Sequence, residues 1–284
     1  MTSKVRMEGD ETDWFGIDVG VRQGCVLSPL LFDLFIDAMA REVKALGLGV
    51  DCGGRKVAIL LYADDIVLLA DSQEDLQKML DAVAGFFKRW RLEVNLSKTK
   101  LMAFGVRALG SMQVRWNGTL VEEVAEYKYL GLMLEKNGWK KEKEKMLRKA
   151  YMAAGMVSGM ALRIGNMTVK GMDSLWKALV RPHLEYGAEV MNTCSDFKWE
   201  EAEVLMRANG RRILKCGSRI PNEAVMGELG WMSMKGRRML LRLGYWGKIV
   251  RMSGGRLVRQ AYEEGRARLE LDAGARTWCS LTRL

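Results

Sequence analysis

Two neighbouring aspartates, Asp64 and Asp65, are the residues of this sequence best suited to chemistry. They lie inside the stretch LLYADDIVLLA, between two apolar runs that favour strands. A simple surface turn at the tip of such a hairpin more often carries Asn-Gly or Asp-Gly. Adjacent carboxylates repel each other, and burial raises the cost unless divalent cations neutralise them. Because Mg²⁺ prefers oxygen ligands, the pair predicts a magnesium site. Two such ions could hold the attacking and leaving oxygens of an in-line displacement at phosphorus.

The rest of the composition leaves few other routes to catalysis. The single histidine, His183, argues against histidine metal sites and against Ser-His or Cys-His catalysis. The five cysteines are scattered and form no C-x-x-C pair, which argues for a reducing compartment and against disulfides or zinc knuckles. No apolar run approaches the ~20 residues that span a bilayer, and the N-terminus lacks a signal-like stretch. We therefore expect an intracellular protein of the nucleus or the cytoplasm, neither secreted nor in a membrane.

The charges are divided unevenly along the chain. The formal net charge is +10, but residues 1–130 hold 16 Lys or Arg against 19 Asp or Glu, a net charge of −3. Residues 131–284 hold 29 against 16, a net charge of +13. A basic second half beside an acidic pair in the first half indicates metal chemistry next to a surface that binds a polyanion. A soluble, lysine-rich helical region is the simpler alternative.

The aspartate pair is expected at the tip of a buried hairpin. Its two strands are expected over residues 57–62 and 66–70. A further strand is expected over residues 92–104, and Asn117-Gly118 marks the turn of a second hairpin. The stretch EYKYLGLML (126–134) indicates another strand or a tight hairpin.

Helices are expected on both sides of the aspartate hairpin. Before it, Ser28 is a suitable N-cap and Pro29 a suitable first helical residue. The apolar face of this helix would consist of Leu30, Leu31, Leu34, Phe35, Ala38 and Met39. After it, Ser72 and Asp75 form a capping-box pattern. The apolar face of this second helix would consist of Leu76, Met79, Leu80, Val83, Phe87 and Trp90.

Beyond Asn137 the pattern becomes helical. Helices are expected near residues 139–160, 168–180, 197–215 and 234–252. The sequence therefore predicts an α+β fold class, in which a mixed region gives way to a helical one near residue 136.

Four stretches, in order, resemble motifs of the reverse transcriptases. They are GVRQGCVLSPLLFDLFID (20–37), YADDIVLLADS (62–72), LEVNLSKTKLM (92–102) and YKYLGLML (127–134). Tyr62-Ala63-Asp64-Asp65 is similar to the Y-x-D-D motif of that family. The variant resembles non-LTR (LINE-type) retrotransposons more than retroviral enzymes, and the C-terminal stretches IPNEAVMGELGWMSM and LRLGYWGKIVRM resemble sequence that follows the polymerase core in those elements.

The resemblance implies an RNA-directed DNA polymerase fold in three parts. Residues 1–135 would form a partial palm, an antiparallel sheet with packed helices. Residues 136–220 would form a helical thumb, and residues 221–284 a C-terminal helical extension. The implied partners are an RNA template, a DNA primer and deoxynucleoside triphosphates, and the thumb's positive charge would hold the nucleic-acid backbone.

Site roles follow from the same resemblance. Asp64 and Asp65 would be catalytic and would bind Mg²⁺. Lys98 would lie near the incoming triphosphate and stabilise or protonate departing pyrophosphate, although Lys100 is an alternative for that role. Two further groups would contact the substrates: Arg22, Gln23, Gly24, Tyr62 and Ala63 the nucleotide and template, and Tyr129, Leu130 and Gly131 the primer, as a primer grip.

One expected carboxylate has no counterpart. In this family a third aspartate, on a strand in an F-x-x-D-type segment well upstream, completes the two-metal site. Asp10, Asp13 and Asp18 precede Arg22, but Asp18 is too close to the RQG segment to take that role. The resemblance therefore implies an N-terminally truncated polymerase core with an incomplete metal site, and we expect that the chain does not polymerise on its own.

Several alternatives stay open. The chain could be a catalytically silent nucleic-acid-binding remnant of a retrotransposon, or a decayed product with no selected role. An intron-encoded maturase is disfavoured by the C-terminal stretches. Simpler readings also exist for the motifs: a helix-entry turn at Gln23-Gly24, a packing hairpin at 129–131, and a solvated helix face at 136–149.

Overall fold

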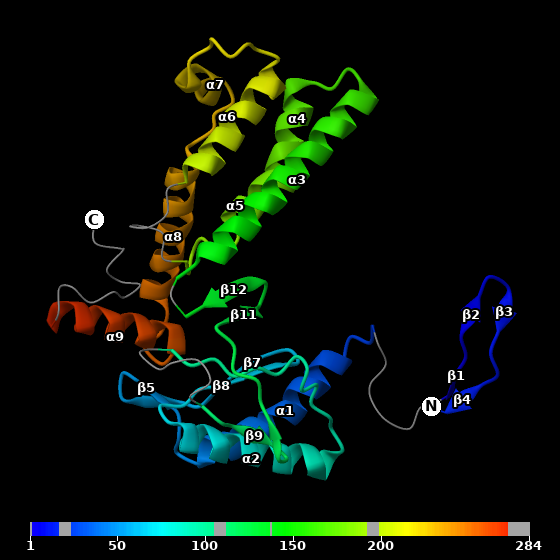
Figure 1. Ribbon diagram of the computed structural model, residues 1–284, viewed down its shortest axis with the longest axis vertical. Helices are drawn as coiled ribbons and strands as arrows, with labels where there is room; N and C mark the ends of the chain where they lie inside the picture. The colour runs from blue at the N-terminus through cyan, green and yellow to red at the C-terminus, as the bar shows by residue number, and fades with distance from the viewer. Residues whose placement is uncertain (1, 17–23, 105–111, 137, 192–198, 272–284) are drawn as a thin grey trace. The chain divides into compact units, whose positions relative to one another are not determined.

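The computed structural model describes residues 2–16, 24–104, 112–136, 138–191 and 199–271 (Figure 1). Helices and two-stranded antiparallel sheets make up this part of the chain, in agreement with the expected α+β class. The chain divides into two compact units, here called unit 1 and unit 2. Unit 1 comprises Met1–Leu96 and Gln113–Val121, and unit 2 comprises Ser97–Met112 and Glu122–Leu284.

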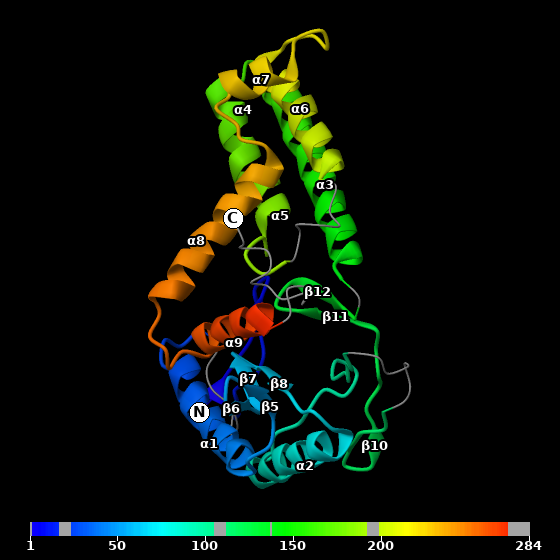
Figure 2. The same ribbon diagram turned by 90° about the vertical axis from the view of Figure 1, so that its left-hand side faces the viewer.

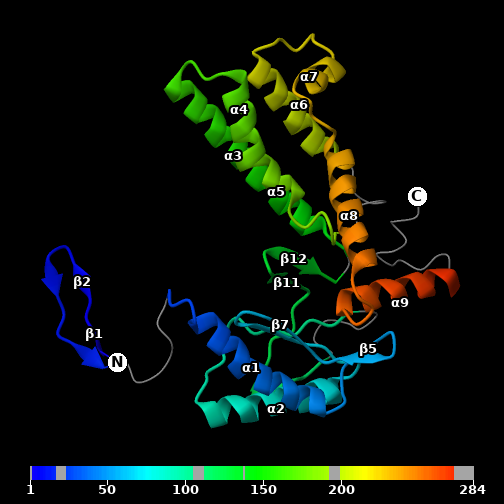
Figure 3. The same cartoon turned by 180° about the vertical axis from the view of Figure 1, so that it is seen from behind.

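Unit 1 combines strand pairs with two long helices. Its elements are β1 (Thr2–Ser3), β2 (Arg6–Met7), β3 (Asp10–Glu11), β4 (Phe15–Gly16), α1 (Ser28–Ala45), β5 (Val50–Cys52), β6 (Arg55–Val57), β7 (Ile59–Tyr62), β8 (Asp65–Leu68), α2 (Gln73–Trp90), β9 (Arg115–Trp116) and β10 (Thr119–Leu120). Strand β1 pairs with β4, β2 with β3, β5 with β6, β7 with β8, and β9 with β10. Helix α1 contacts α2 and β7, and α2 contacts β8, so the two helices support the β7–β8 hairpin (Figure 3).

An aromatic cluster joins α1 to α2. The ring of Phe35 lies 5.3 Å from that of Phe86 and 5.1 Å from that of Trp90, centroid to centroid. At the other side of α2, Phe87 meets Trp116 edge-on at 5.9 Å. Edge-to-face pairs of this kind add stability beyond the apolar area that they bury. The expected apolar face of α2 is largely confirmed, although Trp90 is more than half exposed.

The expected apolar face of α1 is wrong for most of its residues. The helix buries Ile36, Met39, Ala40 and Val43, whereas four residues of the expected face are exposed: Leu30, Leu31, Leu34 and Ala38. Apolar residues occur on more than one side of this helix, and the side that is buried is the one that α2 and β7 contact.

The two predicted helix caps have different outcomes. Ser72 is the N-cap of α2, and its side chain accepts a hydrogen bond of 3.1 Å from the backbone N–H of Asp75, as predicted. The prediction for Ser28 is wrong, because Leu27 occupies the N-cap position of α1 and no side chain caps it. Pro29 still lies in the first turn, where its missing N–H leaves no intrahelical bond unmade.

Gly49, in the link between α1 and β5, has a backbone conformation that only glycine adopts easily. Its φ is +123°, and a Cβ there would lie 2.6 Å from the carbonyl carbon of Val57, just before β7. We expect Gly49→Ala to lower the free energy of unfolding by about 2–4 kcal/mol, because the strain and the overlap with backbone add up. Gly47 is the matched control: its φ is +67° and nothing lies within 4 Å of a Cβ, so Gly47→Ala should cost about 1 kcal/mol. Urea unfolding measures both; equal losses would contradict the expectation.

Unit 2 has one hairpin and a set of packed helices. Its elements are β11 (Glu126–Tyr129), β12 (Leu132–Glu135), α3 (Lys140–Ile164), α4 (Val169–Leu175), the π-helical turn η1 (Trp176–Val180), α5 (Arg181–Glu185), α6 (Glu200–Leu214), α7 (Asn222–Glu228), α8 (Met234–Arg251) and α9 (Leu257–Leu271). The expected helices near 139–160, 168–180, 197–215 and 234–252 are confirmed with small shifts in their ends. Figure 2 shows α3, α4 and α6 side by side, and all three contact one another.

The core of unit 2 forms where α3, η1 and α6 meet. Met146, Ala150 and Val157 line one face of α3 at helical spacing, and they pack in one buried cluster with Trp176 and Leu205. Trp176 is 2% exposed and stacks on Trp231 with ring centroids 5.1 Å apart. The helical spacing of these buried residues explains why the helices beyond residue 137 can be predicted from the sequence.

The π-turn η1 has a local cause in Pro182. Proline has no N–H to donate to the carbonyl of Ala178, and its ring clashes with that carbonyl in a regular helix. The helix widens instead, and the N–H of Arg181 donates to the carbonyl of Trp176 five residues earlier. The helical path from α4 therefore continues through η1 into α5 without a break.

The strand predicted over residues 92–104 is wrong. In that segment only Leu101 takes part in a β-bridge, a parallel one with Glu123. The N–H of Leu101 donates to the carbonyl of Glu122 at 2.9 Å, and its carbonyl accepts from Val124 at 2.8 Å. The segment buries Leu101 and Ala103 without forming a strand. The hairpins at Asn117-Gly118 and within 126–134 are confirmed.

Within the residues that the structure describes, no helix has both the length and the apolar character needed to cross a membrane.

Candidate functional site

The aspartate pair lies at the end of a tight hairpin in unit 1. Tyr62, the last residue of β7, pairs with Asp65, the first residue of β8, so that Ala63 and Asp64 alone form the turn. Cross-strand partners project to the same face of a sheet, which brings the phenol and the Asp65 carboxylate to one side. The predicted hairpin is confirmed, with Asp65 in the strand rather than in the turn.

The hairpin tip is exposed, which corrects the expectation of a buried hairpin. Tyr62 is 63% exposed, and both aspartates are exposed. Burial is confined to the base, where Ile59 packs below the surface. In the part of the chain that the structure describes, neither aspartate carboxylate makes a hydrogen bond or an ion pair with another residue. The two negative charges are thus left for solvent or a ligand.

Ala63 holds a strained conformation at this tip. Its φ is +50°, in the left-handed region, which costs an L-residue with a Cβ about 1–2 kcal/mol. A glycine or asparagine would relieve the strain. Strained residues of this kind cluster at functional sites, so the turn geometry is a reason to regard the tip as a site.

The donor set at the tip suits a hard cation. Among the described residues, no group of three or more His, Cys, Asp or Glu side chains is placed to hold a metal ion. Two carboxylates are nevertheless the usual protein contribution to a Mg²⁺ site, where water and substrate phosphates complete the shell. The residues present fit a cation bound together with a phosphate-bearing substrate.

The residues expected on the nucleotide and template side are only partly described. Arg22 and Gln23 lie outside the described residues. Gly24 is exposed in the turn before α1, with φ at +80° and no atom within 4 Å of a Cβ position. A glycine in this conformation leaves room for close approach to its backbone.

Lys98 belongs to unit 2, in an exposed stretch before the Leu101 bridge. Its carbonyl accepts a hydrogen bond of 3.0 Å from the hydroxyl of Tyr127. The competing lysine, Lys100, forms an ion pair of 2.5 Å with Glu122. That ion pair engages the Lys100 amine locally, and the role of Lys98 at a triphosphate stays a prediction.

The stretch Tyr129–Gly131 forms the turn of the β11–β12 hairpin. Tyr129 pairs with Leu132, and Leu130 and Gly131 have φ values of +46° and +85°. Such a turn normally carries Asn-Gly, and leucine at its first position is strained. The expected packing hairpin is confirmed; a contact with a primer stays a prediction.

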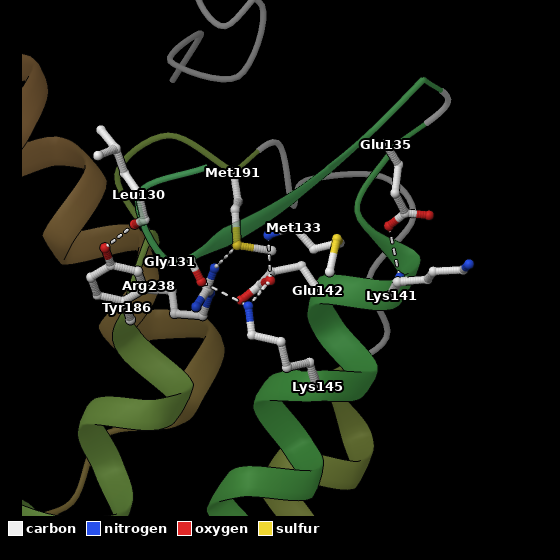
Figure 4. A network of polar contacts seen from close by, with 10 residues as sticks. All are labelled: Leu130, Gly131, Met133, Glu135, Lys141, Glu142, Lys145, Tyr186, Met191 and Arg238. Atoms are coloured by element: carbon white, nitrogen blue, oxygen red, sulfur yellow. Dashed lines mark hydrogen bonds and ion pairs between the residues drawn. The ribbon is translucent and has the colours of Figure 1, made fainter. Parts of the chain in front are cut away.

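Three side chains that hold this turn were not identified from the sequence. Tyr186 donates to the carbonyl of Leu130 at 2.6 Å, and Lys145 donates to the carbonyl of Gly131 at 2.7 Å (Figure 4). Glu142 accepts from the N–H of Met133 at 2.6 Å. In sequence, Glu142 and Lys145 look like part of a solvated Lys/Glu face, and no local signal distinguishes them. Their burial depends on the hairpin that packs against α3.

Positive charge gathers on the helices of unit 2. The solvent side of α3 carries Lys141, Arg148 and Lys149, and the pKa of Lys141 is raised chiefly by its hydrogen bond to Glu126. In α8, Arg238 is buried, donates to the carbonyl of Leu184 at 2.5 Å and lies over the ring of Trp199. Burial lowers the pKa of Arg238 to about 10, so the guanidinium is still protonated at neutral pH.

Comparison with known proteins gives the class to which these features belong. The family described as "Reverse transcriptase (RNA-dependent DNA polymerase)" matches residues 1–134, which include both hairpin turns. Over these residues the chain is similar to the reverse transcriptases.

Individual relatives point to one branch of that family. The chain is 27% identical over 206 residues to the probable RNA-directed DNA polymerase from transposon BS of Drosophila melanogaster, covering 69% of this chain and 22% of the relative. It is 25% identical over 219 residues to the polymerase from mobile element jockey of the same species, covering 75% of this chain and 24% of the relative. A Pol polyprotein from a type-1 R2 retrotransposable element of Nasonia vitripennis is 38% identical over 103 residues, 36% of this chain and 10% of that protein.

These relatives are polymerases of non-LTR retrotransposons, which confirms the predicted resemblance. The chain spans under a quarter of the length of the first two relatives. Their matches cover more of the chain than residues 1–134, so the similarity continues into the helices of unit 2.

Proposed function

We propose that this chain carries the palm and thumb of an RNA-directed DNA polymerase that transfers nucleotides to a primer 3′-OH on an RNA template. The observation that carries the proposal is the exposed Asp64–Asp65 pair on a strained two-residue turn, inside the segment that matches the reverse transcriptase family. In this proposal residues 1–135 form the palm, 136–220 the thumb and 221–284 a helical extension.

Each proposed site residue has a chemical task. Asp64 and Asp65 hold divalent cations, which supply charge stabilisation at the reacting phosphate when bound. Gly24, with Arg22 and Gln23, lets backbone approach the nucleotide and template. Lys98 places a cation near the leaving pyrophosphate.

The remaining tasks concern the primer strand. The Tyr129–Gly131 turn supports its end. Tyr62 and Ala63, by contrast, contact the nucleotide and template. The basic side of α3 neutralises backbone phosphates, which is the main source of affinity in nucleic-acid binding.

A second function, nucleic-acid binding without catalysis, is favoured by one observation. No third carboxylate accompanies Asp64 and Asp65 within the described residues. Primer extension on an RNA template with Mg²⁺ distinguishes the two functions. Extension that is lost in Asp64→Ala would support the polymerase and contradict our expectation that the chain is inactive alone. Salt-dependent binding of an RNA–DNA duplex, unaffected by Asp64→Ala and without extension at any Mg²⁺ concentration, would support the second function. Absence of both would contradict the proposal.

The basic side of α3 gives a quantitative prediction for binding. Arg148→Gln with Lys149→Gln is expected to reduce the dependence of log K on log salt concentration by about 2, because each phosphate contact contributes about 0.9. Glu144→Gln, an exposed change of one charge on the same helix, is the control and should not weaken binding. Fluorescence anisotropy with an RNA–DNA duplex at several salt concentrations measures the slope. An unchanged salt slope in the double variant would show that Arg148 and Lys149 do not contact the nucleic-acid backbone.

A further inference from the structure

The turn between β11 and β12 is held by helix α3 and by the residue that follows α5. Lys145 of α3 donates to the carbonyl of Gly131, and Tyr186, which follows α5, donates to the carbonyl of Leu130 (Figure 4). Just beyond the turn, Glu142 of α3 accepts from the N–H of Met133. Lys145 and Tyr186, 41 residues apart in the sequence, thus hold the same short loop.

The acid at the centre of this arrangement is buried. Glu142 is 1% exposed, and the oxygen that accepts from Met133 also receives the amine of Lys145 at 2.5 Å. Lys145 therefore links a buried carboxylate to the carbonyl of Gly131. Charge-assisted hydrogen bonds are strong in such surroundings, and removing the Lys145 amine leaves the buried Glu142 carboxylate without its countercharge. The group is coupled, so each member supports the rest.

The start of α3 is fixed to the same hairpin. Glu135, the last residue of β12, accepts a hydrogen bond of 2.7 Å from the N–H of Lys141 in the first turn of the helix (Figure 4). A carboxylate is stabilised at a helix N-terminus by the helix dipole. Both ends of β12 are therefore attached to the first turns of α3.

The turn itself is strained and closely packed. Leucine seldom adopts the positive φ of Leu130, and a Cβ on Gly131 would lie 3.1 Å from the hydroxyl oxygen of Tyr186. Strain of this kind persists only where surrounding contacts determine the conformation. The contacts from Glu142, Lys145 and Tyr186 hold the turn in this strained conformation.

We propose that Glu142, Lys145 and Tyr186 form a clamp that positions the Tyr129–Gly131 turn against the primer 3′ end, and this rests on the proposed polymerase function. The clamp engages the two turn carbonyls, whose oxygens would otherwise repel a phosphate. It also makes the position of the turn depend on α3, the helix whose basic side faces solvent. Binding of the duplex backbone to α3 is then coupled to placement of the primer end, because both depend on the position of α3.

Hydrogen exchange on the whole 284-residue chain tests the clamp without any need for activity. Tyr186→Phe removes one hydroxyl, and Lys145→Met removes one amine. Each is expected to speed exchange of the amides of residues 129–134 about tenfold, because the strained turn loses one of the contacts that hold its conformation. Lys149→Met is the matched control: it removes the same charge one helical turn along and should leave these amides unchanged.

Binding then tests the positioning role. We expect Tyr186→Phe to lower the preference for an RNA–DNA duplex with a recessed primer 3′ end over a blunt duplex by about threefold to tenfold. The salt slope and the melting temperature should stay unchanged, since no charge and no apolar area is lost. A merely structural hydroxyl would weaken binding of both duplexes alike.

The outcomes separate the two proposals. Unchanged exchange at residues 129–134 in both clamp variants would overturn the clamp. Faster exchange with an unchanged preference between the two duplexes would overturn its positioning role. A wild-type chain that binds neither duplex would contradict the proposed function and its positioning role together, while the exchange result would still show whether the turn is clamped.

Discussion

In a full-length relative that carries residues 20–134 of this chain in place of its own matching segment, Asp64→Asn is expected to lower primer extension by about 10³-fold or more. Asparagine keeps the shape of the side chain and removes its charge. A metal ion contributes several kcal/mol of charge stabilisation, and each ~1.4 kcal/mol is a factor of ten in rate. Because the tip of the hairpin is exposed, the change should not disturb folding. Gel analysis of extended primer with Mg²⁺ measures the loss.

Asp71 provides the control within the same segment. It is an exposed aspartate six residues beyond Asp65, and its carboxylate lies 3.7 Å from the amine of Lys56. Surface pairs of this kind contribute little, so Asp71→Asn should leave extension within about twofold. Extension by the Asp64→Asn chimera at the level of its parent would show that the pair does not bind a catalytic metal, and the polymerase proposal would then lose the observation that carries it.

Features set by neighbours in the sequence could be predicted. The Asn117-Gly118 turn and the Ser72 cap depend on side chains one to three residues apart, and both are confirmed. The hairpin at Asp64 and the helices beyond residue 137 follow from periodicity over one element. At these positions local preference and the final fold agree, which is the normal condition of a sequence that folds to one structure.

Features set by distant contacts could not be predicted. Helix α1 has apolar residues on several sides, and the contact with α2 decides that Ile36 and Met39 are buried while Leu34 is exposed. Glu142 has the same local surroundings as its exposed neighbour Glu144, yet a hairpin from earlier in the chain covers it. The candidate site divides in the same way: its aspartates were evident from sequence, but the side chains that hold the Leu130 turn were not.

The uneven charge has a structural counterpart that the count alone did not give. Asp64 and Asp65 of unit 1 lie at the exposed tip of one short hairpin, whereas unit 2 carries many of its lysines and arginines along helices. A helix spaces charges over several turns, which suits a regular row of phosphates better than a single ion. In the proposed function, the acidic pair of unit 1 therefore binds a metal ion and the basic helices of unit 2 bind nucleic-acid phosphates.

The core of unit 2 gives the largest expected effect on stability. Trp176→Ala should lower the free energy of unfolding by about 3–5 kcal/mol, because a buried indole leaves a cavity that a close-packed core cannot fill. Total stabilities are usually about 5–15 kcal/mol, so the loss is a large fraction. Trp231 would lose its stacking partner, although its indole N–H would keep the hydrogen bond of 2.8 Å to Asp173. Urea unfolding followed by far-UV circular dichroism measures the change.

Trp246 is the matched control for that experiment. It lies on α8 of the same unit, is 36% exposed, and donates from its indole to the hydroxyl of Tyr262 at 3.1 Å. Trp246→Ala should cost clearly less, about 1–2 kcal/mol, since part of its surface already faces water. Because Trp176 lies in the π-turn that Pro182 imposes, a loss no larger than that of Trp246→Ala would mean that the turn is loosely packed. The helical path from α4 to α5, which leads to Tyr186, would then not hold that residue firmly beneath the Leu130–Gly131 turn.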